Sequence, residues 1–176
     1  LPVMALMSVT TNLMSEGEVF QLVKCGETAL AEADYRTIIE RKTAILIAAA
    51  CALGAMLGDA PEDRVEALRQ FGLRVGAAFQ MTDDTLDYVA REEEFGKAVG
   101  KDLQEGKMTL PLIHALRQGS GEETERIRRA VQERAFDDDT IRFILDVVRS
   151  RSGIDYALGQ AEALIAEAKG LLAPRP

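Results

Sequence analysis

The chain has 176 residues, of which 47% are apolar and 28% are charged, as is ordinary for one globular domain. Its formal net charge of −8 argues against nonspecific nucleic-acid binding, which needs a basic surface. Its cysteines, Cys25 and Cys51, have neither metal-ligand spacing nor the density of a secreted disulfide scaffold, so a reducing, cytoplasmic compartment is the simplest one.

The composition favours an all-α fold, because Ala, Leu, Glu and Arg are abundant and runs of β-branched or aromatic residues are few. The spacing of apolar residues predicts a first helix over 6–25. A second helix is expected over about 35–57, with Asp34 as its N-cap. A third is expected over 62–90, after a break that contains Gly and Pro.

Two features of these helices bear on packing. Residues 44–58 carry no charge, but this stretch is shorter than the roughly 17–25 residues that span a bilayer, so we expect a buried core helix. Gly72 and Gly76 lie four residues apart in the third helix and would permit another helix or a ligand to approach closely.

The amino-acid composition then changes. Residues 91–107 are rich in Glu, Gly and Lys, lack apolar periodicity, and indicate a polar loop. A short helix is expected to open at Thr109 and to end near Gly119, with His114 as a partly buried packing residue. Residues 122–172 indicate two or three amphipathic surface helices.

Three aspartates, Asp83, Asp84 and Asp87, interrupt the apolar pattern of the third helix. Side chains four apart share a helix face, so Asp83 and Asp87 would point the same way and repel each other. An acidic cluster is often only a solvated face. Here it lies in the middle of an apolar segment and lysines follow it, so the sequence predicts a site where carboxylates bind Mg²⁺ together with substrate phosphates.

Other polar residues extend this prediction. Gln80 is three residues before Asp83 and would share its face, and Lys42 and Thr43 precede the uncharged stretch. Each has an ordinary alternative, since a lone Gln is usually a surface residue and a lone Lys is usually solvated. Together, Mg²⁺, lysines and an apolar interior suit a diphosphate attached to a hydrocarbon.

In these segments the chain resembles the trans-polyprenyl diphosphate synthases over about residues 7–116. The matching segments, in chain order, are RKTAILIAAACALGA from Arg41, GLRVGAAFQMTDDTLDY from Gly72, GKAVGKD from Gly96 and EGKMTLP from Glu105, and EGEV from Glu16 is also similar. The resemblance implies an antiparallel helix bundle around a hydrophobic cavity, a homodimer, and Mg²⁺-dependent condensation of isopentenyl diphosphate with an allylic diphosphate.

The resemblance also implies roles for single residues. The aspartates match the family's second aspartate-rich motif, which holds metal. The residues that match substrate diphosphate-binding or catalytic positions are Lys42, Thr43, Gln80, Lys97 and Lys107. The product would be hydrophobic, which leaves open its delivery at a membrane surface without a membrane span.

The first aspartate-rich motif of the family would precede Leu1, so we expect a fragment without the N-terminal helices that is inactive alone. We expect 1–176 to be one domain, with core helices and the catalytic loop in 1–119 and peripheral helices in 120–176. Two alternatives stay open: a terpene cyclase-like enzyme, against which the low aromatic content of 5% argues, and a non-catalytic subunit of a prenyl synthase.

Overall fold

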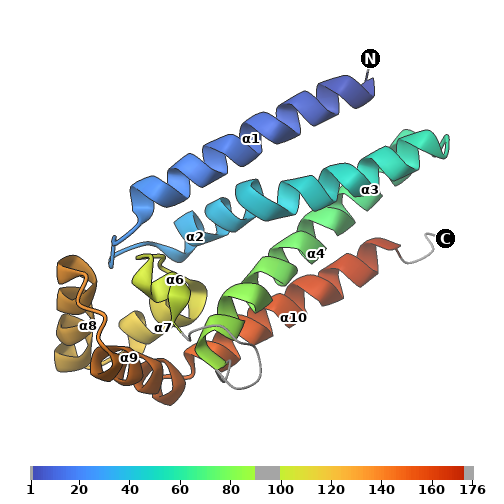
Figure 1. Ribbon diagram of the computed structural model, residues 1–176. Coiled ribbons are helices and arrows are strands. Elements are labelled where there is room, and N and C mark those ends of the chain that lie inside the picture. The colour runs from blue at the N-terminus through green and yellow to red at the C-terminus, as the bar shows by residue number, and fades with distance from the viewer. Residues whose placement is uncertain (1, 90–99, 173–176) are drawn as a thin grey trace. The chain divides into compact units, whose positions relative to one another are not determined.

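The computed structural model describes residues 2–89 and 100–172, and every regular element in these two ranges is a helix. The elements, shown in Figure 1, are α1 (Pro2–Lys24), α2 (Glu32–Ile39), the π-helical turn η1 (Glu40–Ala44), α3 (Ile45–Leu57), α4 (Glu62–Val89), α6 (Lys101–Gln104), α7 (Leu110–Gln118), α8 (Gly121–Glu133), α9 (Asp138–Ser150) and α10 (Gly153–Leu172). The all-α prediction is confirmed. Across those ranges no helix has both the length and the apolar character needed to cross a membrane.

The chain forms two compact units, and α1, α2, α4 and α10 each contribute residues to both. The first contains the described parts of Leu1–Phe20, Arg36–Gln80 and Gln160–Pro176, and the second contains Gln21–Tyr35 and Met81–Gly159 without its undescribed residues. The single domain and its division at residue 119 stay predictions.

Helix α4 packs closely on η1 and α3 in the first unit, as the two glycines predicted. A Cβ atom added at Gly72 would lie 2.7 Å from the Cα of Ala48, and one at Gly76 would lie 2.6 Å from the Cα of Ala44. The facing surface of α3 is correspondingly small: its buried residues are Ala48, Ala49, Ala52 and Ala55. The uncharged stretch is therefore a packed helix, buried along its alanine face.

The helix predicted over 35–57 starts earlier than expected. The backbone N–H groups of Asp34 and Tyr35 both donate to the carbonyl of Ala31, at 3.0 and 3.1 Å. Helix α2 therefore begins at Glu32, and the prediction of Asp34 as its N-cap is wrong. Asp34 instead lies in the first turn, where a carboxylate is favourable, and pairs with Lys24 at 3.5 Å.

The same predicted helix is also interrupted, because η1 is a π-helical turn between α2 and α3. Such wide turns are uncommon and occur often at functional sites. Helix α1 approaches this turn closely: a Cβ atom added at Gly17 would lie 2.7 Å from the backbone nitrogen of Lys42. Figure 1 shows α1 running alongside this segment. The turn thus places Arg41 and Lys42 beside α1.

The core of the second unit lies among α7, α8 and α9. Its fully buried side chains include Leu110, Leu112, Ile127, Ile144 and Val148. The predicted start and end of α7 are confirmed, and the C-terminal residues form three helices whose buried faces are apolar.

His114 of α7 stacks on Tyr156 with a centroid distance of 4.1 Å. Burial, together with the charge of Arg117, holds the pKa of His114 below its usual value. The prediction of a partly buried packing residue is confirmed.

The segment predicted as a polar loop over 91–107 differs in its second half. Residues 101–104 form α6, which begins after Gly100, whose φ of +81° lies in the left-handed region that glycine favours. The loop prediction is wrong for these residues, because a helix of one turn is too short to show apolar periodicity. The first half of the predicted loop falls outside the described residues.

Candidate functional site

Helix α4 carries Gln80 and the three aspartates without a break, as predicted. The aspartates nevertheless have different surroundings. Asp83 is exposed, Asp87 is half-buried, and Asp84 is only 7% exposed. A helix turns about 100° per residue, so residues 83 and 84 cannot share one environment when one side of the helix is packed.

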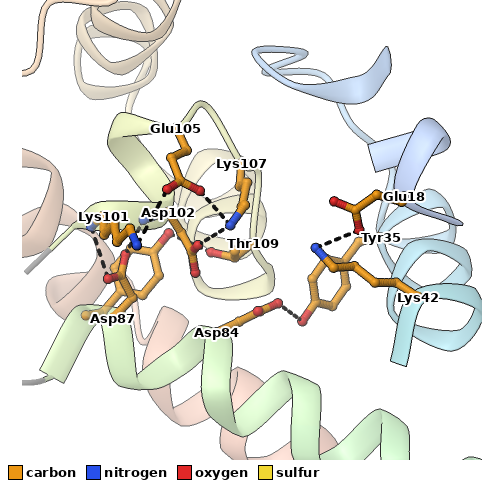
Figure 2. Close-up of polar contacts among 11 residues, drawn as sticks. Glu18, Tyr35, Lys42, Asp84, Asp87, Lys101, Asp102, Glu105, Lys107 and Thr109 are labelled. Carbon is orange, nitrogen blue, oxygen red and sulfur yellow. Dashed lines mark hydrogen bonds and ion pairs between the residues drawn. The ribbon is translucent and has the colours of Figure 1, made fainter. Parts of the chain in front are cut away.

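Asp84 is held by a partner that the sequence did not reveal. The hydroxyl of Tyr35, in α2, donates to Oδ2 of Asp84 at 2.7 Å, and both residues are buried (Figure 2). A buried phenol needs a hydrogen-bond partner and a buried carboxylate needs a donor, so the pair satisfies two otherwise costly groups. Tyr35 thereby fixes the orientation of one carboxylate oxygen of the aspartate motif.

Asp87 turns its carboxylate to the start of α6. Its Oδ1 accepts the backbone N–H of Lys101 at 3.1 Å, and its Oδ2 accepts that of Asp102 at 3.0 Å (Figure 2). Burial, and then the charge of Asp102, raises the pKa of Asp87 above its usual value, while the backbone hydrogen bonds oppose that rise. These contacts make Asp87 the cap of α6.

In the described part of the chain, no three His, Cys, Asp or Glu side chains are grouped so that they could hold a metal ion. In the same helix, Tyr35 orients Asp84 and the amides of α6 engage Asp87. Carboxylates remain the ligand type that Mg²⁺ prefers, and Mg²⁺ commonly uses one or two of them with substrate phosphates. Metal binding by all three aspartates stays a prediction.

Another polar group of the second unit surrounds Lys107. We call Lys107, Asp102 and Glu105 the Lys107 cluster: the ammonium lies 2.7 Å from Asp102 Oδ1 and 2.8 Å from Glu105 Oε2 (Figure 2). Burial by itself would lower the pKa of Lys107, but the hydrogen bonds to the two carboxylates outweigh it and raise that pKa above its ordinary range. Lys107 is therefore a fixed cation. Lys97 lies outside the described residues.

The end of α4 is anchored beside this cluster. The hydroxyl groups of Tyr88 and Thr109 lie 2.6 Å apart, and both side chains are buried. Burial raises the pKa of Tyr88 well above its ordinary range, so the phenol stays neutral and hydrogen-bonded. This contact ties the residue after Asp87 to the N-cap of α7.

In the first unit, the structure brings together two of the predicted site residues. The hydroxyl of Thr43 donates to Oε1 of Gln80 at 2.7 Å, from η1 to α4. Since the hydroxyl proton is directed at Gln80, the lone pairs of the Thr43 oxygen remain able to face positive charge.

Lys42 extends from the same turn toward α1. Its ammonium lies 3.1 Å from Oε2 of Glu18, and the neighbouring Arg41 pairs with Glu16 at 3.1 Å. Figure 2 shows the Lys42–Glu18 contact. Each basic residue of the turn therefore pairs with its own carboxylate. The two glutamates lie two residues, or about half a helical turn, apart on α1.

These residues occur in the order of a known family. The sequence pattern described as polyprenyl synthetase matches residues 1–148. The chain belongs to the polyprenyl synthetase family. Among its relatives, the octaprenyl diphosphate synthase of Haemophilus influenzae is 38% identical over 162 residues, which cover 92% of this chain and 49% of that protein. The octaprenyl diphosphate synthase of Escherichia coli is 41% identical over 133 residues, covering 76% and 41%.

Solved structures of polyprenyl synthases have the same fold. A polyprenyl synthase from Caulobacter crescentus, complexed with calcium and isoprenyl diphosphate, matches with a TM-score of 0.93 and 35% identity over 100% of this chain and 54% of that one. A decaprenyl diphosphate synthase from Rhodobacter capsulatus matches with a TM-score of 0.91 and 32% identity over 99% and 54%. The chain thus spans about half the length of the family members it matches.

Proposed function

We propose that this chain is part of a prenyltransferase that condenses isopentenyl diphosphate with an allylic diphosphate, repeatedly and head to tail, and releases pyrophosphate. The observation that carries the proposal is the family match over residues 1–148, which contain all eight predicted site residues. The names of its relatives include octaprenyl, nonaprenyl and geranylgeranyl diphosphate synthases, so the product is an isoprenyl diphosphate whose length these names leave open.

The cations of the chain would bind the diphosphate. Lys42 and Lys107 are each paired with carboxylates in the structure, so each is already oriented by an anionic group. An oriented ammonium stabilises the charge that develops on a departing pyrophosphate better than a solvated one, because it needs no reorganisation during the reaction. Lys97 is proposed for the same role from its place in the family motif.

Asp83 and Asp84 are the carboxylates that best suit a divalent ion. Asp83 is exposed, and the hydroxyl of Tyr35 donates to Oδ2 of Asp84. Mg²⁺ bound there would supply Lewis-acid stabilisation of the diphosphate leaving group. Mg²⁺ commonly uses one or two protein carboxylates together with substrate phosphates, and these two aspartates could supply them.

The chemical step needs a site that tolerates a carbocation. The allylic C–O bond breaks with its electron pair leaving on pyrophosphate, the alkene of isopentenyl diphosphate attacks the allylic carbon, and loss of a proton forms the new double bond. The oxygen of Thr43 directs its proton to Gln80, so its lone pairs could stabilise the positive charge. Apolar walls would exclude water, which otherwise captures the cation.

The direct test is prenyl transfer by this chain with labelled isopentenyl diphosphate, farnesyl diphosphate and Mg²⁺, followed by separation of products by length. We expect no product from the 176-residue chain and elongated product once the segment that precedes it in the family is restored. If the restored protein makes no elongated product, the proposed reaction is wrong. If the short chain alone elongates, the family's first aspartate motif is dispensable.

A second candidate is a subunit that assists a catalytic partner. One relative, 47% identical over 97 residues, is named heptaprenyl diphosphate synthase component 2. The two candidates differ in the restored protein: a subunit would stay inactive until its partner is added, whereas a synthase would act alone. We also propose a homodimer that is located in the cytoplasm.

A further inference from the structure

We propose that Asp87 is a positioning residue that fixes α6 and the Lys107 cluster. The expected effect on diphosphate binding rests on the proposed function. The positioning of α6 rests only on the contacts in the structure. Three hydrogen bonds join Asp87 to the start of α6: two from amides to its carboxylate, and one from the Gly100 N–H to its backbone carbonyl at 3.2 Å.

Both carboxylate oxygens of Asp87 are engaged by this cap. The first N–H groups of a helix have no partner within the helix, and a carboxylate at the N-terminus satisfies them and complements the helix dipole.

Helix α6 depends on the cap because it has only four residues. A helix of one turn is not stable by itself, so its conformation is set by contacts with the rest of the fold. The same residues hold Lys107: the N–H of Lys107 donates to the carbonyl of Asp102 at 2.9 Å, and its ammonium lies against the Asp102 carboxylate. The contacts therefore run from Asp87 through the Asp102 backbone to Lys107.

Two measurements on the 176-residue chain test this proposal. The first is amide hydrogen exchange at Lys101 and Asp102. We expect exchange to be roughly three- to thirtyfold faster in Asp87→Ala, the range of a lost N-cap, with wild-type exchange in α7 as the folding control. Asp87→Asn retains one acceptor oxygen and should protect one of the two amides. Asp83→Ala should leave both protected.

The second measurement is pyrophosphate binding with and without Mn²⁺. If Asp87 positions Lys107, Asp87→Ala weakens binding without metal by about threefold or more, because the cation is no longer fixed. If Asp87 were instead a metal ligand, removing its negative charge would leave metal-free binding unchanged or tighter and would abolish the gain from Mn²⁺. Asp83→Ala is expected to show that second pattern.

The outcomes separate the two ideas. Unchanged exchange at Lys101 and Asp102 in Asp87→Ala overturns the positioning role, as does a pyrophosphate response that matches that of Asp83→Ala. If the exchange responds as expected but the wild-type chain binds no pyrophosphate under either condition, the positioning of α6 stands and diphosphate binding by the Lys107 cluster of this chain is overturned, whereas prenyl transfer is tested in the restored protein.

Discussion

At the residue scale, two of the lysines assigned to diphosphate binding, Lys42 and Lys107, are paired with carboxylates of the same chain. Lys42 faces Glu18, and Lys107 faces Asp102 and Glu105. An anionic ligand must therefore compete with Glu18 for Lys42. The Glu18 carboxylate is more than half exposed, so its ion pair is weak and solvent-screened. Such a pair orients the lysine, and a ligand with higher charge can still displace the Glu18 carboxylate from it.

The competition predicts the effect of neutralising Glu18. Glu18→Gln should raise the affinity for pyrophosphate by about 1.4- to fivefold, because an exposed ion pair contributes about 0.2–1 kcal/mol. Glu16→Gln is the matched control, since it removes the same charge from α1 but breaks the ion pair with Arg41 instead of the one with Lys42. Isothermal titration calorimetry measures both. Equal effects of the two variants would show that only the net charge of α1 matters.

The Thr43–Gln80 hydrogen bond predicts a second residue-scale effect. In the protein with the preceding segment restored, Thr43→Ala should lower kcat by about tenfold or more if its oxygen stabilises developing charge. Thr43→Ser keeps the hydroxyl that donates to Gln80 and should retain most of the activity. Single-turnover measurements isolate the chemical step. Unchanged turnover in Thr43→Ala would remove this role.

At the element scale, the glycines of α4 act by allowing close approach. Gly72→Ala and Gly76→Ala place a methyl group within 2.7 Å of α3 or η1 backbone, and each should destabilise the chain by about 1–3 kcal/mol, as overpacking does. Gly54→Ala is the control: nothing lies within 4 Å of its added Cβ, so it should stabilise α3 by about 0.5–1 kcal/mol. Urea unfolding measures all three, and equal changes would contradict the packing argument.

Helix α8 begins with a reciprocal cap whose strength depends on pH. The Ser120 N–H donates to the Glu123 carboxylate at 2.7 Å, and the Glu123 N–H donates to the Ser120 hydroxyl at 3.2 Å. Ser120→Ala should cost about 1 kcal/mol of stability. The Ser120 N–H, and then the Arg151 guanidinium, hold the pKa of Glu123 below its ordinary value of 4.5.

The lowered pKa sets the direction of the pH effect. The unfolded chain takes up the Glu123 proton first on acidification, so the contribution of this carboxylate is present above pH 4.5 and is lost as the pH falls through the folded pKa. Glu123→Gln should therefore lose less stability than wild type between neutral and strongly acidic pH, by urea unfolding at each pH. A parallel loss in both proteins would place the pH dependence elsewhere.

The elements also show which features the sequence could predict. The extents of α4 and α7 follow from apolar periodicity and from residues such as Gly119 at their ends, all of which are local. The π-helical turn was missed because it contains neither Gly nor Pro to mark it. The partners of the aspartates were missed for another reason: Tyr35 lies 49 residues from Asp84, and only the fold brings them together.

At the scale of the whole molecule, an apolar stripe on α1 is a candidate for the predicted homodimer interface. Val19, Leu22 and Val23 are 59%, 65% and 71% exposed, and the spacing of three and four residues places them on one face of the helix. Isolated exposed apolar residues are ordinary, but a contiguous group of large ones favours an interaction surface.

The stripe predicts how the chain associates. The double variant Leu22→Glu and Val23→Glu should weaken self-association by about tenfold or more, since it replaces buried apolar surface at an interface with like charges on both copies. Leu57→Glu is the control, because Leu57 is 78% exposed at the end of α3 and lies outside the stripe. Sedimentation equilibrium over a range of concentrations measures each dissociation constant. If the double variant and the control associate as the wild type does, a homodimer of this chain must use another surface, and the exposure of α1 is not explained by self-association.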